Sequence, residues 1–460
     1  MSPFHFLLVV GSLTAASHPL GPAVSVTRGF VAATGLVIGW SLLANVSARW
    51  TARSVLAGDL RPRDAVGLYD RQRSGFRWVG LFAAWYAVGG CGLAAGVDGW
   101  VVTTTSMTAR TLLVLWPAVM LAGGLAMADQ TFRRTLGLWP DDALAAMSVS
   151  AAMRRALVAV RGTIGLMIGP LVVVMAVADL GRWLDLGSHL GPISLATLGV
   201  CVGAVLIVGM PRLMRLVLRG RPMTGNYGRW IGEVCTAAGL KGTPINRWDT
   251  GGQSANAMVA GLIGRRELWL TDRLIDTLTP PQLAMVVLHE IAHVRRRHMA
   301  IRVLSLVPAW IVPIAVARHF DQTAPAMLAS SVVGIAMTML TLRMVAHRGE
   351  YDADATACDL AAAIGGGVDH VPPDRDTAAA VLAETLVRVT ADATSSDRGG
   401  WLHPSTASRV RRLIGTRSDD YSTASKSSKS SRSSSSSSSS SSDELFSPNS
   451  AEISSSISIS

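Results

Sequence analysis

The feature that most constrains this chain is a series of long apolar stretches separated by short loops that contain arginine. A helix needs about 20 apolar residues to cross a bilayer, with about 17 as the lower limit. Stretches of this length occur at 29–46, 76–96, 111–128, 162–180, 193–210, 301–317 and 326–345. The pattern predicts a mainly α, polytopic helical membrane protein.

Two apolar segments fit this pattern less well. The stretch 301–317 is marginal in length, although a membrane helix tolerates its Pro308 and Pro313. The segment 4–24 has a short apolar core, interrupted near its end by histidine and proline. It lacks the positively charged start of a signal peptide. It is therefore either an additional span or a segment that lies in the membrane interface.

Composition agrees with a membrane protein. Only 16% of the residues are charged, whereas soluble domains average about 25%. The net charge of +11 raises the possibility of a nucleic-acid partner, but the arginines lie in short loops between apolar segments. That placement is typical of membrane topology and not of a basic nucleic-acid surface. We therefore expect a lipid bilayer as partner and no nucleic acid.

The distribution of arginine among the loops predicts the orientation in the cell membrane. Arginine-rich loops alternate with loops that hold a single arginine, and positively charged loops stay in the cytoplasm. The rich loops are 47–75 and 129–161, and the poor loops are 97–110, 181–192 and 318–325. This alternation puts both 211–300 and 346–460 on the cytoplasmic side. A multi-pass protein with its C-terminus in the cytoplasm is expected.

Three regions are predicted along the chain. Residues 1–210 form a membrane region with many spans, and residues 211–417 form a mixed α+β domain that includes the last two spans. In the domain, 226–240 reads as a helix and 254–271 as two strands. The third region, 418–460, is mostly serine and is expected to be disordered.

A further helix is predicted from the sequence TLTPPQLAMVVLHEIAHVRRRH. Thr279 can cap this helix, and Pro280 suits its first position. A buried apolar stripe is expected at Leu283, Val286, Val287 and Ile291.

The motif HEIAH lies on this helix. His289 and His293 then project from one face, one turn apart, while Glu290 is offset by about 100°. Two histidines at this spacing are suited to zinc, and the glutamate between them is suited to activate a zinc-bound water. The alternative is a helix with two histidines that only have structural contacts. Zinc also needs a third protein ligand.

Glu350 is the candidate for the third ligand. A histidine six residues beyond His293 would be an alternative, but that position is Met299. Glu350 follows the stretch 326–345 and shares a helix face with Asp354. Asp354 can accept the free ring N–H of a ligating histidine and so fix its tautomer. The competing interpretation of Glu350 is a solvated charge at the end of a membrane helix.

Four segments in this order resemble a known family. NAMVAG, TPPQLAMVVLHEIAHVRRRH, EYDADA and HPSTASRV are similar to segments of the integral-membrane zinc metalloproteases of the HtpX and CAAX prenyl endopeptidase type, which are gluzincins. The resemblance covers about 245–415. It implies one Zn²⁺ per chain, held by His289, His293 and Glu350. It also implies that Glu290 is the catalytic acid and base.

The resemblance implies roles for three further residues. Asn256 and the strand that follows it would hold the backbone of a peptide substrate. His403 matches a histidine-proline motif of the family, and Arg409 matches the arginine six residues later. Either could stabilise the oxyanion that forms during peptide hydrolysis. Without the resemblance, His403 reads as a loop histidine and Asn256 as a turn residue.

The expected function is that of a zinc-dependent membrane endopeptidase, which cleaves protein or peptide substrates at the cytoplasmic face with a zinc-activated water. Two alternatives remain. One is a membrane zinc-protease signal transducer of the beta-lactam-sensor type, although only the serine-rich segment follows the last span. The other is a non-catalytic polytopic scaffold or transporter. An intramembrane protease of the sterol-regulator type is disfavoured, because no later span carries an Asp-Gly motif.

Overall fold

The computed structural model describes most of the chain up to residue 415. The described residues are 3–17, 21–22, 24–104, 106–136, 149–185, 191–218, 220–252, 254–261, 266–305, 307, 311–312, 315–316, 319, 324–390 and 400–415. Contacts divide the chain into two units, Met1–Ile414 and Gly415–Ser460. The expected disordered region 418–460 lies outside the described residues.

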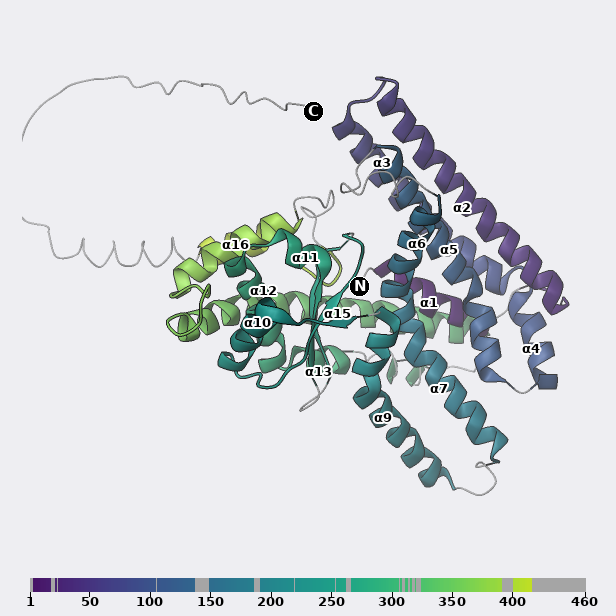
Figure 1. Ribbon diagram of the computed structural model, residues 1–460. Helices are drawn as coiled ribbons and strands as arrows, with labels where there is room; N and C mark the ends of the chain where they lie inside the picture. Colours follow the sequence, from purple (N-terminus) through teal and green to yellow (C-terminus); the bar gives the residue numbers. More distant parts are fainter. Residues whose placement is uncertain are drawn as a thin grey trace, which may run out of the picture. The chain divides into compact units, whose positions relative to one another are not determined.

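The first half of the chain is helical (Figure 1). Two of its helices begin at a serine whose side chain accepts a backbone N–H, which satisfies a donor that the helix itself leaves unpaired. These serines are Ser25 and Ser106. The helices are α1 (Pro3–Ser17), α2 (Val26–Leu56), α3 (Pro62–Gly89), α4 (Leu93–Thr104), α5 (Met107–Thr135), α6 (Val149–Val160), the π-helix η2 (Arg161–Gly165), α7 (Leu166–Trp183) and α9 (Pro192–Leu218).

Five helices are long and apolar enough to cross a membrane. They span Val26–Leu56, Asp64–Gly99, Met107–Thr135, Val149–Trp183 and Ala329–Ile364, and they contain five of the predicted stretches. Of the other predicted spans, 193–210 lies within α9, and 301–317 lies partly outside the described residues. The segment 4–24 gives a helix of only 15 residues, α1, which is shorter than a span requires.

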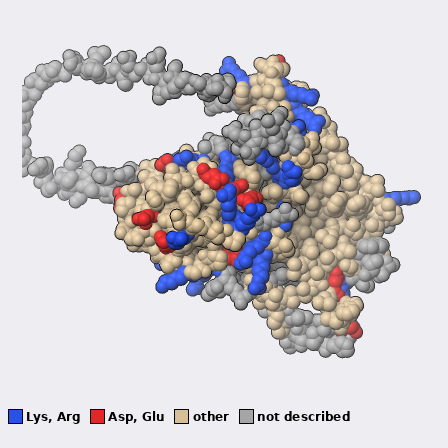
Figure 2. Space-filling view, in the orientation of Figure 1, with Lys and Arg blue, Asp and Glu red and all other residues tan. Residues whose placement is uncertain are grey.

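Helix packing in this bundle is typical of a membrane protein. Along α2 the buried positions are small, such as Ala33, Ala44 and Ala48, which lets neighbouring backbones approach closely. Large apolar side chains on α2, such as Leu42 and Trp50, are instead exposed. On the face shown in Figure 2, a broad area of the helical part carries few charged side chains. This surface suits contact with lipid.

The domain after residue 220 combines a small mixed sheet with helices. The strand order is β1-β2-β4-β3, with β2 parallel to β4 and the other pairs antiparallel. The strands are β1 (Arg221–Pro222), β2 (Ile245–Trp248), β3 (Ala257–Ala260) and β4 (Glu267–Thr271). The two predicted strands correspond to β3 and β4. The short strands β1 and β2 were not predicted.

Helix α12 is the centre of this domain. Thr279 and Gln282 form a capping box at its start, and Pro280 is its first residue, so the predicted N-terminus is confirmed. The helix is buried over more than the expected stripe: Val286 is only partly buried, whereas Ala284 and Leu288 are also enclosed. It packs against β3, α10, α15 and α16. The helices of the domain are α10 (Gly225–Ala237), α11 (Asp272–Thr277), α12 (Pro280–Arg295), α13 (His298–Leu304), α15 (Ala324–Ile364) and α16 (Arg375–Thr390).

Helix α15 joins a membrane span to the domain. Its 41 residues contain the predicted span 326–345 and continue without a break to Ile364. The second part packs against α12 through buried alanines, including Ala353 and Ala357. These small side chains let the two helices approach closely. Residues around 350 are therefore held next to the HEIAH segment.

Candidate functional site

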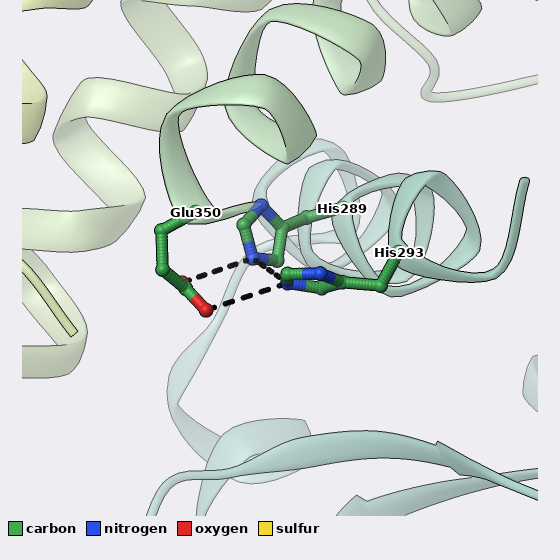
Figure 3. A group of neighbouring side chains, drawn as sticks. All are labelled: His289, His293 and Glu350. Carbon is green, nitrogen blue, oxygen red and sulfur yellow. Dashed lines mark hydrogen bonds and ion pairs between the residues drawn. The ribbon is translucent and has the colours of Figure 1, made fainter. Parts of the chain in front are cut away.

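The two HEIAH histidines and Glu350 meet where α12 and α15 pack together. Figure 3 shows both rings, from one helix, and the carboxylate, from the other, pointing toward one another. The Nε2 atoms of His289 and His293 are 3.2 Å apart. Each Nε2 lies 3.5 Å from an oxygen of Glu350. All three side chains are buried or partly buried.

These distances match those required to hold zinc. Ligand atoms at about 2.0–2.1 Å from a tetrahedral Zn²⁺ are separated by about 3.3–3.4 Å. The observed separations of 3.2, 3.5 and 3.5 Å lie close to this value. Two imidazoles and one carboxylate also form a ligand set that catalytic zinc sites use, with a fourth position left for water. The cluster of His289, His293 and Glu350 can therefore hold a metal ion.

Asp354 lies behind His289, as predicted. Its Oδ1 is 3.0 Å from Nδ1 of His289, the ring nitrogen that faces away from Glu350. Arg409 in turn donates from Nε and Nη2 to the two oxygens of Asp354, at 2.8 and 2.5 Å. Both Asp354 and Arg409 are buried. Because Asp354 is held on its other side, it fixes the orientation of the His289 ring.

A second chain of contacts, which sequence reasoning missed, lies behind His293. Its Nδ1 is 2.8 Å from Nδ1 of His298, and Nε2 of His298 is 2.9 Å from Asp352. Asp352 accepts two hydrogen bonds from Arg296. If Nε2 of His293 binds a metal, its Nδ1–H must donate to His298. The N–H of His298 then lies on Nε2 and donates to Asp352.

The position of His298 depends on a reversal of the chain. Helix α12 ends at Arg295, and Arg297 has the left-handed backbone conformation, with φ of 55°. This turn starts α13 and brings His298 back toward His293, which lies one turn before the end of α12. A left-handed arginine has no signal in the helical pattern. Proximity of a third histidine to HEIAH was the only available indication.

The electrostatic environment of the site favours a positive charge between the carboxylates. Burial lowers the pKa of His289, but Asp354 and Glu350 outweigh this effect and raise its pKa to about 9. Burial and the charge on His289 lower the pKa of His293 to about 3. The two rings thus share one positive charge, as expected for a pair that faces a carboxylate. A bound cation would supply that charge.

Glu290 has a different environment from Glu350. Burial raises the pKa of Glu290 to about 7, and the neighbouring positive charge of His289 opposes this shift only in part. A carboxyl group with a pKa near neutral can both accept and return a proton under physiological conditions. Its position next to His289 in the sequence, but offset around the helix, separates it from the metal ligands.

Three basic side chains surround Glu350. Arg302, from α13, donates to Oε1 at 3.0 Å, and Nη1 of Arg409 lies 3.3 Å from Oε2. Nδ1 of His403 lies 3.1 Å from Oε2, and 55% of the His403 side chain is exposed. His403 is therefore on the open side of the cluster. Arg302 was not predicted.

Asn256 lies in the sheet and not in the cluster. Its backbone N–H donates to Oγ1 of Thr271, and its carbonyl accepts the N–H of Thr271. Its side chain is exposed. It directly precedes β3, which forms one edge of the sheet and packs against α12. No strand in the described part of the chain pairs with the outer side of β3.

The comparisons with known proteins agree with this geometry. Residues 225–417 match the model of Peptidase family M48. The search of curated proteins finds no match to the chain. The matched residues include HEIAH, Glu350, Asp354, His403 and Arg409, which the fold brings together. The chain thus carries an M48 peptidase domain and, with its apolar helices, fits an integral-membrane M48 metallopeptidase.

Proposed function

We propose that this protein is a zinc-dependent endopeptidase of the membrane, with its active site at the cytoplasmic face. The observation that carries the proposal is the cluster of His289, His293 and Glu350, whose ligand atoms have the separations of a zinc site within an M48 domain. Zinc bound there would lower the pKa of a water and polarise the carbonyl of the scissile peptide bond.

Glu290 acts as the general base and acid in this proposal. It takes a proton from the attacking water and later gives it to the amine that leaves. Its pKa of about 7 supports both steps at neutral pH. Cleavage of a casein or an unfolded membrane protein by the purified full-length chain, and loss of that cleavage in Glu290→Gln, tests the function.

His403 and Arg409 have different proposed roles. His403 is exposed beside Glu350, which supports a role as donor to the oxyanion of the tetrahedral intermediate. Arg409 uses Nε and Nη2 for Asp354, and its side chain is only 10% exposed. That arrangement supports a positioning role for Arg409, through Asp354 and Glu350, more than the predicted contact with substrate.

The substrate is proposed to bind as an added strand. The free edge of β3 offers backbone N–H and C=O groups to an extended peptide, a common mode of peptide recognition. Asn256 precedes this edge, and its exposed side chain can hydrogen-bond to the peptide backbone. Contacts with the backbone would let many sequences bind, so selection would depend on which segments reach the site in an extended form.

His298→Ala is expected to weaken zinc affinity by about 10- to 100-fold, the usual cost of losing the partner of a ligating histidine. Without His298, the Nδ1–H of His293 loses its acceptor and the ring is free to rotate. Zinc affinity is measured by competition with a chromogenic chelator. His298→Gln should recover part of the affinity, because its amide can accept from His293 and donate to Asp352. Equal affinity in wild type and His298→Ala would exclude the positioning role.

The cytoplasmic orientation gives a labelling prediction. Starting from a variant without native cysteines, Lys241→Cys and Arg411→Cys introduce single thiols at exposed positions of the domain. A membrane-impermeant maleimide should not label them in intact cells but should label both after permeabilisation. Trp183→Cys is the positive control, since Trp183 is 80% exposed and lies in the arginine-poor loop 181–192. Labelling of Lys241→Cys in intact cells would reverse the orientation.

A further inference from the structure

A basic pocket lies outside the metal cluster, where α9 ends beside the sheet. It encloses about 560 Å³ between the end of α9, the loop 239–244 and the first residues of β4. Its lining includes four basic side chains and one carboxylate: Arg212, Arg215, Lys241, Arg266 and Glu267. The pocket thus has an excess of three positive charges, and the proposed peptidase chemistry uses none of them.

Only one of the four cations is required by the fold. Arg215 donates to both oxygens of Glu267 through Nε, and its Nη2 forms an ion pair with the same carboxylate. Glu267 is buried and also accepts from Nδ2 of Asn246 in β2, at 2.9 Å. This network satisfies the single carboxylate of the pocket. Among the described residues, none forms an ion pair or side-chain hydrogen bond with Arg212, Lys241 or Arg266. Three cations that gather without an anion indicate an anionic ligand.

The position of the pocket on α9 identifies the kind of anion. Residues 205, 208, 212 and 215 are spaced by three or four, so they follow one face of the helix. Val205 and Val208 are 70% and 42% exposed, and the two residues that continue this face are Arg212 and Arg215. The face is therefore apolar within the expected span and cationic at its end. A free phosphate would have no use for the apolar part.

We propose that this pocket binds the headgroup of an anionic phospholipid. The phosphate lies among Arg212, Lys241 and Arg266, and the acyl chains lie along the apolar face of α9 that ends at Val208. Basic pockets beside cytoplasmic helix ends are suited to such lipids. Because Glu267 is the first residue of β4, a lipid held here connects the membrane to the sheet, in which β4 pairs with the edge strand β3. The proposal does not depend on the peptidase function.

The test is lipid binding to the full-length protein in detergent, followed by native mass spectrometry. Phosphatidylglycerol should bind more tightly than phosphatidylcholine, which has no net charge. In the double variant Arg212→Gln/Lys241→Gln, affinity for phosphatidylglycerol should fall by about 25-fold, since each basic residue near an anionic lipid contributes about fivefold. The matched control Arg229→Gln/Arg411→Gln removes two exposed arginines of the same domain outside the pocket. It should bind the lipid as wild type does.

Further arms separate the possible outcomes. If the double variant does not fold, Lys241→Gln alone changes an exposed loop residue and should still cost about fivefold. Glycerol 3-phosphate should compete only weakly, because it lacks acyl chains. Competition at similar concentrations would show that the site takes a free phosphate and would overturn the lipid assignment. Equal binding of the two lipids, or an equal loss in both double variants, would overturn the proposal altogether.

Discussion

Glu290→Gln is expected to lower kcat for peptide cleavage by about 10²- to 10⁴-fold while the protein keeps its zinc and its fold. Glutamine has nearly the same shape as glutamate but cannot take a proton from water. The wild-type carboxyl group is suited to that transfer, because burial raises its pKa to about 7. Since Glu290 is not part of the cluster that can hold the metal, zinc content should not change.

The measurements are the rate of casein cleavage and the zinc content of the purified protein by mass spectrometry. Glu233→Gln is the matched control, since Glu233 is an exposed glutamate on α10. It should keep both the zinc and the wild-type rate. Cleavage by Glu290→Gln at the wild-type rate would contradict the proposed mechanism. If wild type binds zinc but no substrate is ever cut, a sensor or a scaffold becomes the better explanation.

Several elements could be predicted because their signals are local. The start of α12 follows from Thr279 and Pro280, and β3 and β4 follow from apolar residues bounded by turn residues. The contact of Asp354 with His289 follows from helical spacing once Glu350 is next to HEIAH. In each case a few consecutive residues carry the information. The order of four such segments then led to the correct domain family.

Other features were not predictable because they depend on contacts between distant segments. Strand β1 has two residues, too few for any alternating pattern, and it exists only because β2 pairs with it. Arg302 meets Glu350 after a chain reversal at Arg297, and the same reversal positions His298. The partners of Arg409 could not be read from its motif, since a guanidinium can bind a substrate or a carboxylate equally well. Burial next to Asp354 distinguishes the two.

Glu350→Ala is expected to remove zinc and activity together. The chain should hold about one Zn²⁺, and the carboxylate supplies one of three protein ligands. If a protein zinc site contributes about 10–16 kcal/mol, the loss of a third of this corresponds to about 10²- to 10⁴-fold in affinity. The substitution also leaves Arg302 and Arg409 without one anionic partner in a buried site, so some loss of stability is expected.

A second variant and a control separate loss of the ligand from loss of the fold. Glu350→Gln keeps the size of the side chain and leaves only a weakly ligating amide oxygen, so zinc should fall while the helical circular-dichroism signal remains. Glu384→Ala, at an exposed glutamate on α16, should keep about one zinc per chain. Equal zinc retention in the Glu350 and Glu384 variants would remove Glu350 from the site. Because α15 carries Glu350 on the same continuous helix as a membrane span, the metal site would then need a different ligand, and the helix that links it to the membrane would lose its proposed role in the chemistry.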